Sequence, residues 1–213
     1  DRDVFAFDPD TLAPKPVPHF AQVGTVLFNM AVNPLTGMLY VTNTEALNSV
    51  RFEGTGVHGG STVRGHLVET RITVIDPLTG TVSPKHLNQH VDFSQFSASA
   101  HAGSKPHSLS NLRHLVVSSD GQKIYAAAMG SAKVAVFDTA DIEDANFATN
   151  FDPTVKSSQY LDVGEGPSGV ALDETHGRLY VTTRFDNSVR AITLSNGSSE
   201  THAMHNPESA AII

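Results

Sequence analysis

The sequence predicts an all-β protein, a β-propeller built from four-stranded antiparallel blades. One short apolar strand occurs three times, as MLYVTN at 38–43, KIYAAA at 123–128 and RLYVTT at 178–183. Each copy follows another apolar run and a turn that contains a glycine, which is the pattern of a β-hairpin. The 16 Gly, the 11 Pro and the 17% charged residues are also typical of a turn-rich β protein. A β-sandwich with similar hairpins is the alternative.

The three copies belong to three units that share one order of elements. The first two strands of each unit are expected within 29–43, 114–128 and 169–183. A third strand follows within 71–80, 133–141 and 188–197, and a weaker fourth strand within 81–84 and 159–164. Four strands that recur in this order predict one blade per unit.

The N-terminal residues add part of another blade. Residues 3–14, DVFAFDPDTLAP, resemble a third strand and its turn. We therefore expect a single propeller region over 1–213, with blade units at about 1–28 (partial), 29–110, 111–166 and 167–206. That makes about three and a half blades, whereas propellers close with four to eight. We expect a partial propeller, with the missing blades upstream, downstream or in partner chains, and the start at Asp1 without Met suggests a processed or partial chain.

Charge and cysteine content exclude several classes of function. The formal net charge is −8, so we expect no nucleic acid or anionic membrane as a partner. No apolar run approaches the roughly 20 residues of a membrane span. The chain has no Cys, which excludes disulfides, thiolate metal sites and Cys-x-x-Cys-His haem attachment within these residues. A chain without Cys fits an exported bacterial protein.

Two connections are much longer than the repeat requires. They span about 44–70, between the second and third strands of the first unit, and 85–111, between the first and second units. Both are predicted on the same face of the propeller, where loops on a rigid scaffold commonly carry function. The connection 142–158 joins a third strand to a fourth, so we expect it on the opposite face.

This face supplies the candidate binding residues. Their charges have mixed signs, which favours a polar protein interface over a phosphate pocket, with pairing inside the loops as the alternative. The candidates are Asn43, Glu45, Arg51, Glu53, His58, Arg64, His66, Lys105, His107, Met129, Arg184 and Asp186.

Histidines gather in the same two connections. Seven of the 11 His, at positions 58, 66, 86, 90, 101, 107 and 114, lie in or beside them. His86 and His90 are weak candidates for metal ligands, since they are four residues apart without the Glu of a His-Glu-x-x-His motif. Surface imidazoles bonded to loop backbone are the alternative, and we expect no metal. No nucleophile elbow, phosphate loop or calcium loop appears in the sequence, so we expect no catalytic residue.

The strings LYVTN and VNPLTG resemble the YVTN-repeat β-propellers, which are mostly extracytoplasmic proteins of bacteria and archaea. TNTEALNSVRFEG, TVRGHLVETRITVID and HNPESAAI further resemble a subset fused to a c-type cytochrome region, often related to di-haem cytochrome c peroxidases. The resemblance implies a periplasmic or extracellular protein with the propeller beside a haem domain. It implies no cofactor within this chain, because the chain lacks Cys; c-type haem is expected in the full-length protein or in a partner.

Three functions are compatible with these observations. The first is a non-catalytic propeller scaffold that meets a protein partner or an adjacent cytochrome c domain through 44–70 and 85–111. The second is the propeller portion of a haem-dependent, peroxidase-like enzyme. The third is a metal-dependent propeller hydrolase resembling lactonases, which needs a metal in the central tunnel.

Overall fold

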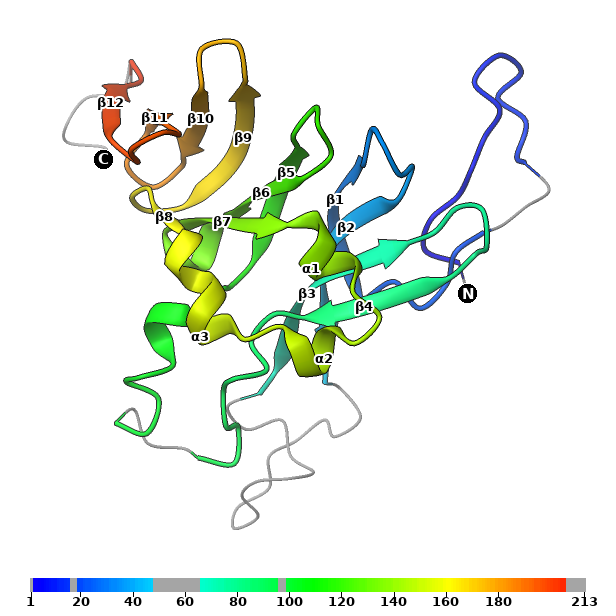
Figure 1. The fold of residues 1–213 in the computed structure, drawn as a ribbon, viewed down its shortest axis with the longest axis horizontal. Coiled ribbons are helices and arrows are strands. Elements are labelled where there is room, and N and C mark those ends of the chain that lie inside the picture. The colour runs from blue at the N-terminus through cyan, green and yellow to red at the C-terminus, as the bar shows by residue number, and fades with distance from the viewer. Residues whose placement is uncertain (1, 16–18, 48–65, 96–98, 206–213) are drawn as a thin grey trace.

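We describe the chain from a computed structural model that covers residues 2–15, 19–47, 66–95 and 99–205. These residues form three four-stranded antiparallel sheets with few helices (Figure 1). No helix in the described ranges is long and apolar enough to cross a membrane.

Each sheet corresponds to one predicted unit, and its strands follow one another in chain order. Blade 1 consists of β1 (Val26–Val32), β2 (Leu39–Ala46), β3 (Val68–Ile75) and β4 (Val82–His86). Blade 2 consists of β5 (Leu112–Val117), β6 (Lys123–Ala128), β7 (Lys133–Asp138) and β8 (Leu161–Asp162). Blade 3 consists of β9 (Pro167–Asp173), β10 (Arg178–Thr183), β11 (Ser188–Thr193) and β12 (Ser199–Ala203).

The repeated string is the second strand of each blade, as predicted. Tyr40, Tyr125 and Tyr180 occupy equivalent positions in β2, β6 and β10. The preceding turns need a residue in the left-handed region, and Gly37, with φ of 75°, supplies it in blade 1. At the start of that turn the Asn33 side chain accepts hydrogen bonds from the backbone N–H groups of Leu35 and Thr36, at 2.9 and 3.3 Å.

The blades stand side by side around a common axis, as in a propeller (Figure 1). Strand β5 contacts both β1 and β9, so the first strands of the three blades form the inner edge. One apolar core fills the space between blades 1 and 2 around Tyr40, Ile72 and Phe137. Another fills the space between blades 2 and 3 around Val134 and Leu179. The protein is therefore a β-propeller, and its described residues contain 12 strands that make three blades.

The N-terminal residues flank blade 1. Isolated antiparallel bridges join Val4 to Phe20 and Phe7 to Pro14, in place of the regular strand expected at 3–14. Phe20 and Val23 pack with Val41 in a third apolar cluster, against the outer face of blade 1. This segment extends the row of blades by a partial unit (Figure 1).

The long connections of blade 1 are shorter than the sequence indicates, because the strands extend further. Strand β2 pairs with β3 as far as Ala46 and Val68, and the Leu47 N–H donates to the Leu67 carbonyl at 2.9 Å. The connection 44–70 therefore starts at Leu47 and ends at Leu67. The connection 85–111 likewise starts after His86, since Lys85 and His86 belong to β4.

The connection between β7 and β8 differs from the prediction in course and content. It forms the short helices α1 (Thr139–Glu143), α2 (Phe147–Asn150) and α3 (Pro153–Lys156). Helix α1 packs against β3 and helix α2 against β4 of blade 1. The connection begins on the expected opposite face but then runs along the outer edge of the blades (Figure 1). It follows this course because Ile142, Phe147 and Phe151 are buried in the core between blades 1 and 2.

Candidate functional site

The candidate site lies where β2 and β4 end and β3 begins, at the root of both long connections. In antiparallel pairing Arg71 of β3 lies opposite His86 of β4, and Glu69 lies opposite Glu45 of β2. Side chains opposite one another, or two residues apart on one strand, share a face of the sheet. The pairing therefore brings four polar side chains together on one face of blade 1.

Arg71 holds the two carboxylates of this face. Its Nε and Nη2 donate to Glu69 Oε2 at 2.9 and 2.7 Å, and its Nη1 donates to Glu45 Oε2 at 3.4 Å. The Arg71 and Glu69 side chains are only 18% and 19% exposed. Two charge-assisted hydrogen bonds between partly buried side chains fix the orientation of the Glu69 carboxylate. Both of these hydrogen bonds go to Oε2 and leave the second oxygen, Oε1, without a hydrogen bond from Arg71.

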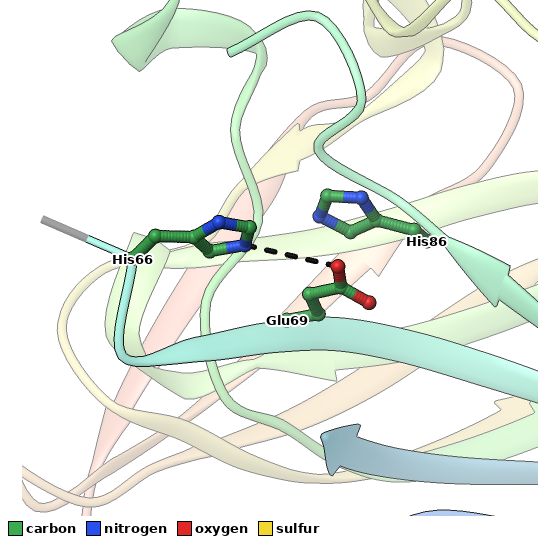
Figure 2. A group of neighbouring side chains, drawn as sticks. All are labelled: His66, Glu69 and His86. Atoms are coloured by element: carbon green, nitrogen blue, oxygen red, sulfur yellow. Dashed lines mark ion pairs between the residues drawn. The ribbon is translucent and has the colours of Figure 1, made fainter. Parts of the chain in front are cut away.

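Glu69 Oε1 faces two imidazoles. His66 comes just before β3, and its Nε2 lies 3.8 Å from Glu69 Oε1. His86 approaches from the end of β4, and Figure 2 shows the Glu69 carboxylate reaching toward both rings. One ligand atom from each of His66, Glu69 and His86 lies within 4.8 Å of the other two. We refer to these three residues as the His66–Glu69–His86 group.

Phe93, from the second long connection, covers this group. Its ring stacks on His66 with centroids 3.6 Å apart and an angle of 6° between the planes. It also lies 6.3 Å from the His86 ring. The Nε2 atoms of both histidines are buried and have no hydrogen-bond partner among the described residues. The group thus contains two buried nitrogen atoms without a hydrogen bond, in a position that Phe93 partly shields from water.

Burial controls the charge of both imidazoles. Burial lowers the pKa of His66 below its usual value, and the Glu69 carboxylate opposes this effect. Burial also lowers the pKa of His86; Glu69 again opposes it, and the neighbouring His66 and Arg71 reinforce it. Both rings are therefore neutral near pH 7, which leaves a nitrogen lone pair available on each.

A polar cleft of about 650 Å³ adjoins the group. It lies between the N-terminal segment, which contributes Asp3 and Gln22, and blade 1, which contributes Thr25, Glu45 and Arg71. Arg71 and Glu45 therefore belong both to the cleft and to the network that orients Glu69.

The other predicted binding residues lie in different surroundings. Lys105 and His107 belong to a short 3₁₀ helix in the second connection, where Lys105 is exposed and His107 Nδ1 lies 2.6 Å from Ser157 Oγ. Met129 starts another 3₁₀ turn, between β6 and β7. Arg51, Glu53, His58 and Arg64 lie outside the described residues.

The remaining candidates contribute to structure. Asn43 differs from the expectation of a loop residue, because it lies inside β2 and is fully buried. Its Nδ2 donates to Thr73 Oγ1 at 2.8 Å, which ties β2 to β3. Arg184 and Asp186 are exposed in the turn between β10 and β11 of blade 3, away from blade 1 in the fold. Asp186 pairs with Arg190 at 3.0 Å.

The histidine pair singled out by sequence spacing is divided in the structure. His86 belongs to the group with His66 and Glu69, whereas His90 Nε2 lies 3.1 Å from the Ser104 carbonyl oxygen. Sequence reasoning missed Glu69, Arg71 and Phe93. The DPLTG turn at 76–80 carried a signal for Arg71, because counting outward from the turn pairs Arg71 with His86. Nothing in the sequence places Phe93 on His66.

Comparisons with known proteins agree with the fold. No protein-family model and no curated protein matches the chain. The chain is similar to the solved structure of hydrazine synthase from Kuenenia stuttgartiensis, with a TM-score of 0.60 and 14% identity over 88% of this chain and 50% of that one. It is also similar to the periplasmic gluconolactonase PpgL of Pseudomonas aeruginosa, with a TM-score of 0.55 and 17% identity over 95% of this chain and 49% of that one. At these identities the likeness shows the propeller fold alone, and the chain spans about half the length of both structures.

Proposed function

We propose that this chain is a non-catalytic propeller scaffold of an exported bacterial protein, and that it binds a c-type cytochrome domain, within its own polypeptide or in a partner. The observation that carries the proposal is the position of the two long connections. Both leave blade 1 at the same end, where β2 and β4 finish and β3 begins. Strands β2 and β3 hold the ends of the first connection, and β4 of blade 1 and β5 of blade 2 hold the ends of the second. Because rigid sheets fix these ends, we propose that the two connections together bind the partner.

The polar character of this surface supports a protein partner. Lys105 is exposed in the second connection, and Glu45 and Arg71 line the cleft beside the first. Interfaces that form between separately folded domains are commonly polar at their rim. The cytochrome as the particular partner, and the periplasmic or extracellular location, rest on the resemblance to cytochrome-fused YVTN propellers.

The test is a binding measurement between this chain and the haem-bearing part of the encoded protein. Deletion of 55–68 and the reversal Lys105→Glu should each weaken the complex, measured as an increased dissociation constant. Arg178→Glu, at the opposite end of blade 3, is the matched control and should leave binding unchanged. Equal binding by all variants would exclude this face as the interface.

A second measurement addresses the haem itself. The full-length protein should stain for haem and show a Soret band. Peroxidase activity in that protein would favour the second function, in which the propeller is part of a haem enzyme. A full-length protein without haem would remove the cytochrome from the proposal.

The lactonase-like alternative has less support. That function needs a metal near the central axis, which the inner strands β1, β5 and β9 surround. The three metal-competent residues found among the described residues lie instead at the ends of β3 and β4, in the outer half of blade 1. The scaffold proposal therefore takes precedence.

A further inference from the structure

We propose that His66, Glu69 and His86 form a binding site for a single divalent transition-metal ion, with Zn²⁺ as the best match to the ligands. The donors are two imidazole nitrogens and one carboxylate oxygen. Zinc sites with an open position commonly use three protein ligands of these kinds and complete a tetrahedron with water. Calcium and magnesium prefer oxygen ligands alone, so the imidazoles favour a transition metal.

The distances between the donors suit this geometry. In a tetrahedral site with bonds of about 2.0–2.2 Å, neighbouring ligand atoms are about 3.4 Å apart. His66 Nε2 and Glu69 Oε1 are 3.8 Å apart, and all three ligand atoms lie within 4.8 Å of one another. These separations exceed the tetrahedral value by about 0.4 Å for the His66–Glu69 pair and by at most about 1.4 Å for any pair, so small side-chain rotations would close the site. The separation of 6.1 Å between the two ring centroids also allows one ion to lie between the rings.

The missing hydrogen bonds of the two histidines support the metal site independently of these distances. Nε2 of His66 and Nε2 of His86 are both buried without a hydrogen-bond partner among the described residues. A buried polar atom without a partner destabilises the folded state, so such atoms call for an explanation. Coordination of one ion satisfies both at once.

The surroundings of the ligands also match a metal site. Ligands in such sites are usually oriented by neighbouring hydrogen bonds. Arg71 holds Glu69 through Oε2 at 2.7 Å and leaves Oε1 free for an ion. The positive charge of Arg71 is offset by Glu45, whose Oε2 lies 3.4 Å from Arg71 Nη1. The carboxylates of Glu45 and Glu69 outnumber the guanidinium of Arg71, so these three side chains together carry one negative charge, which favours a cation.

The competing explanation is that Phe93 stacking alone accounts for the position of His66. Stacking does not explain why Glu69 Oε1 and His86 converge on the same point (Figure 2). In the metal site, Phe93 has a definite role, because an apolar cover limits the access of water to the ion.

The experiment uses the 213-residue chain, freed of metal with a chelator and then titrated calorimetrically with zinc chloride at pH 7.5. One equivalent should bind to the wild type. His86→Gln and Glu69→Gln should each weaken binding roughly tenfold or more. The control is His176→Gln, which removes another imidazole beside a carboxylate, with Nδ1 2.8 Å from Asp173 Oδ2. It should leave the zinc affinity unchanged, because only one carboxylate accompanies this exposed ring.

Two further measurements keep the test decisive if a variant folds poorly. Zinc should raise the melting temperature of the wild type, because a ligand that binds only the folded state stabilises it. Anomalous scattering from zinc-soaked crystals should locate the ion between His66 and His86. An ion found elsewhere, the absence of one-equivalent binding, or equal affinity in His86→Gln, Glu69→Gln and His176→Gln would each overturn the proposal.

Discussion

At the scale of single residues, several turns depend on the left-handed backbone region. Ala132 has φ of 55° between a 3₁₀ turn and β7, and Asn187 has φ of 48° at the equivalent place before β11. Asn tolerates this conformation, whereas an alanine there costs about 1–2 kcal/mol. Blade 2 therefore carries local strain at Ala132 that blade 3 avoids at the same point of its repeat.

Ala132→Gly is expected to raise the free energy of unfolding by up to about 1 kcal/mol, because glycine adopts positive φ without strain. Urea denaturation measures the change. Ser131→Gly is the matched control; its φ is not positive, so the added chain entropy should leave stability unchanged or lower. A gain of the same size in both variants would contradict the explanation by strain.

The free energy of unfolding at acidic pH also depends on single residues. Asp138 accepts a contact of 2.8 Å from Lys123 Nζ, and the hydrogen bond to Lys123 is the main reason that its pKa lies below its usual value. A carboxyl group with a lower pKa in the folded state stabilises that state while it is ionised. Its contribution is present above about pH 4 and disappears as the pH falls through the folded-state pKa.

The free energy of unfolding should therefore decrease as the pH falls from about 5 to 3, and it should decrease less in Asp138→Asn. Thermal unfolding across this pH range measures both slopes. Asp10→Asn provides the comparison, because the Asp10 carboxylate is exposed and has no side-chain hydrogen bond within the described residues. This variant should follow the wild-type slope, and a flattened slope for it would point to net charge instead of the Lys123 contact.

At the scale of elements, the repeated tyrosine makes different hydrogen bonds in different blades. The Tyr40 hydroxyl donates to Glu143 Oε1 of α1 at 2.5 Å and accepts from Asn33 Nδ2 at 2.9 Å. The same Asn33 group donates to the Gly121 carbonyl of blade 2 at 3.0 Å. Burial, together with the hydrogen bond to Glu143, raises the pKa of Tyr40 well above its usual value, so the hydroxyl stays protonated as a donor. This network joins β2, α1 and the β5–β6 turn.

Tyr40→Phe should lower the free energy of unfolding by about 1–3 kcal/mol, because it leaves buried partners unpaired. Tyr180→Phe changes the equivalent residue of blade 3, whose hydroxyl has no hydrogen bond among the described residues, and should cost less than about 0.5 kcal/mol. Chemical denaturation compares the two. Equal losses would show that the tyrosine ring environment, and not the network, sets the cost.

Elements with a strong pattern are those that the sequence predicted. The strands are short runs rich in Val, Leu, Ile and Tyr that are separated by Asn-Pro, Asp-Gly or His-Gly turns, so the blades could be predicted from 29–43, 114–128 and 169–183. Helices α1, α2 and α3 have five, four and four residues, which is too short for a helical period to show. Only the spacing of Phe147 and Phe151 hinted that this connection has an apolar face.

The candidate site was predictable in part. His66 and His86 were both among the histidines gathered in or beside the two long connections; His66 was a candidate binding residue of the first connection, and His86 a weak candidate for a metal ligand. Their meeting depends on the register of β3 with β4, which follows from the 76–80 turn once the hairpin is accepted. Arg71, two residues away on the same strand, orients the Glu69 carboxylate, and the pairing of β3 with β4 brings His86 to it.

At the scale of the whole molecule, stability is not uniform along the row of blades. Blade 2 has a blade on each side, and Ala126, Ala127 and Ala128 of β6 are fully buried. All five residues of β12, at the outer edge of blade 3, are exposed. Regions with few buried contacts open at lower free energy than the core.

Hydrogen exchange should therefore be slowest in β6 and β7 and fastest in β12. Mass spectrometry of peptides from each strand measures this order. Protection of β12 equal to that of β6 would mean that another surface covers the outer edge of blade 3 in solution. Uniform exchange over all three blades would indicate a single cooperative unit.

The helical connection between β7 and β8 has a mechanical consequence. Blades 1 and 2 contact each other in two places. Near the axis β5 packs against β1 and β2, and at the outer edge α1 and α2 pack against β3 and β4. Lys85 Nζ adds a hydrogen bond of 2.7 Å to the Asp144 carbonyl. Blades 2 and 3 meet through β5, β6 and the 3₁₀ turn at 129–131 of blade 2, which pack against β9 of blade 3, and within the described residues no α-helix is among the main contacts between these two blades. Because of this second set of contacts, we expect blades 1 and 2 to move as one unit and any relative motion to be larger between blades 2 and 3.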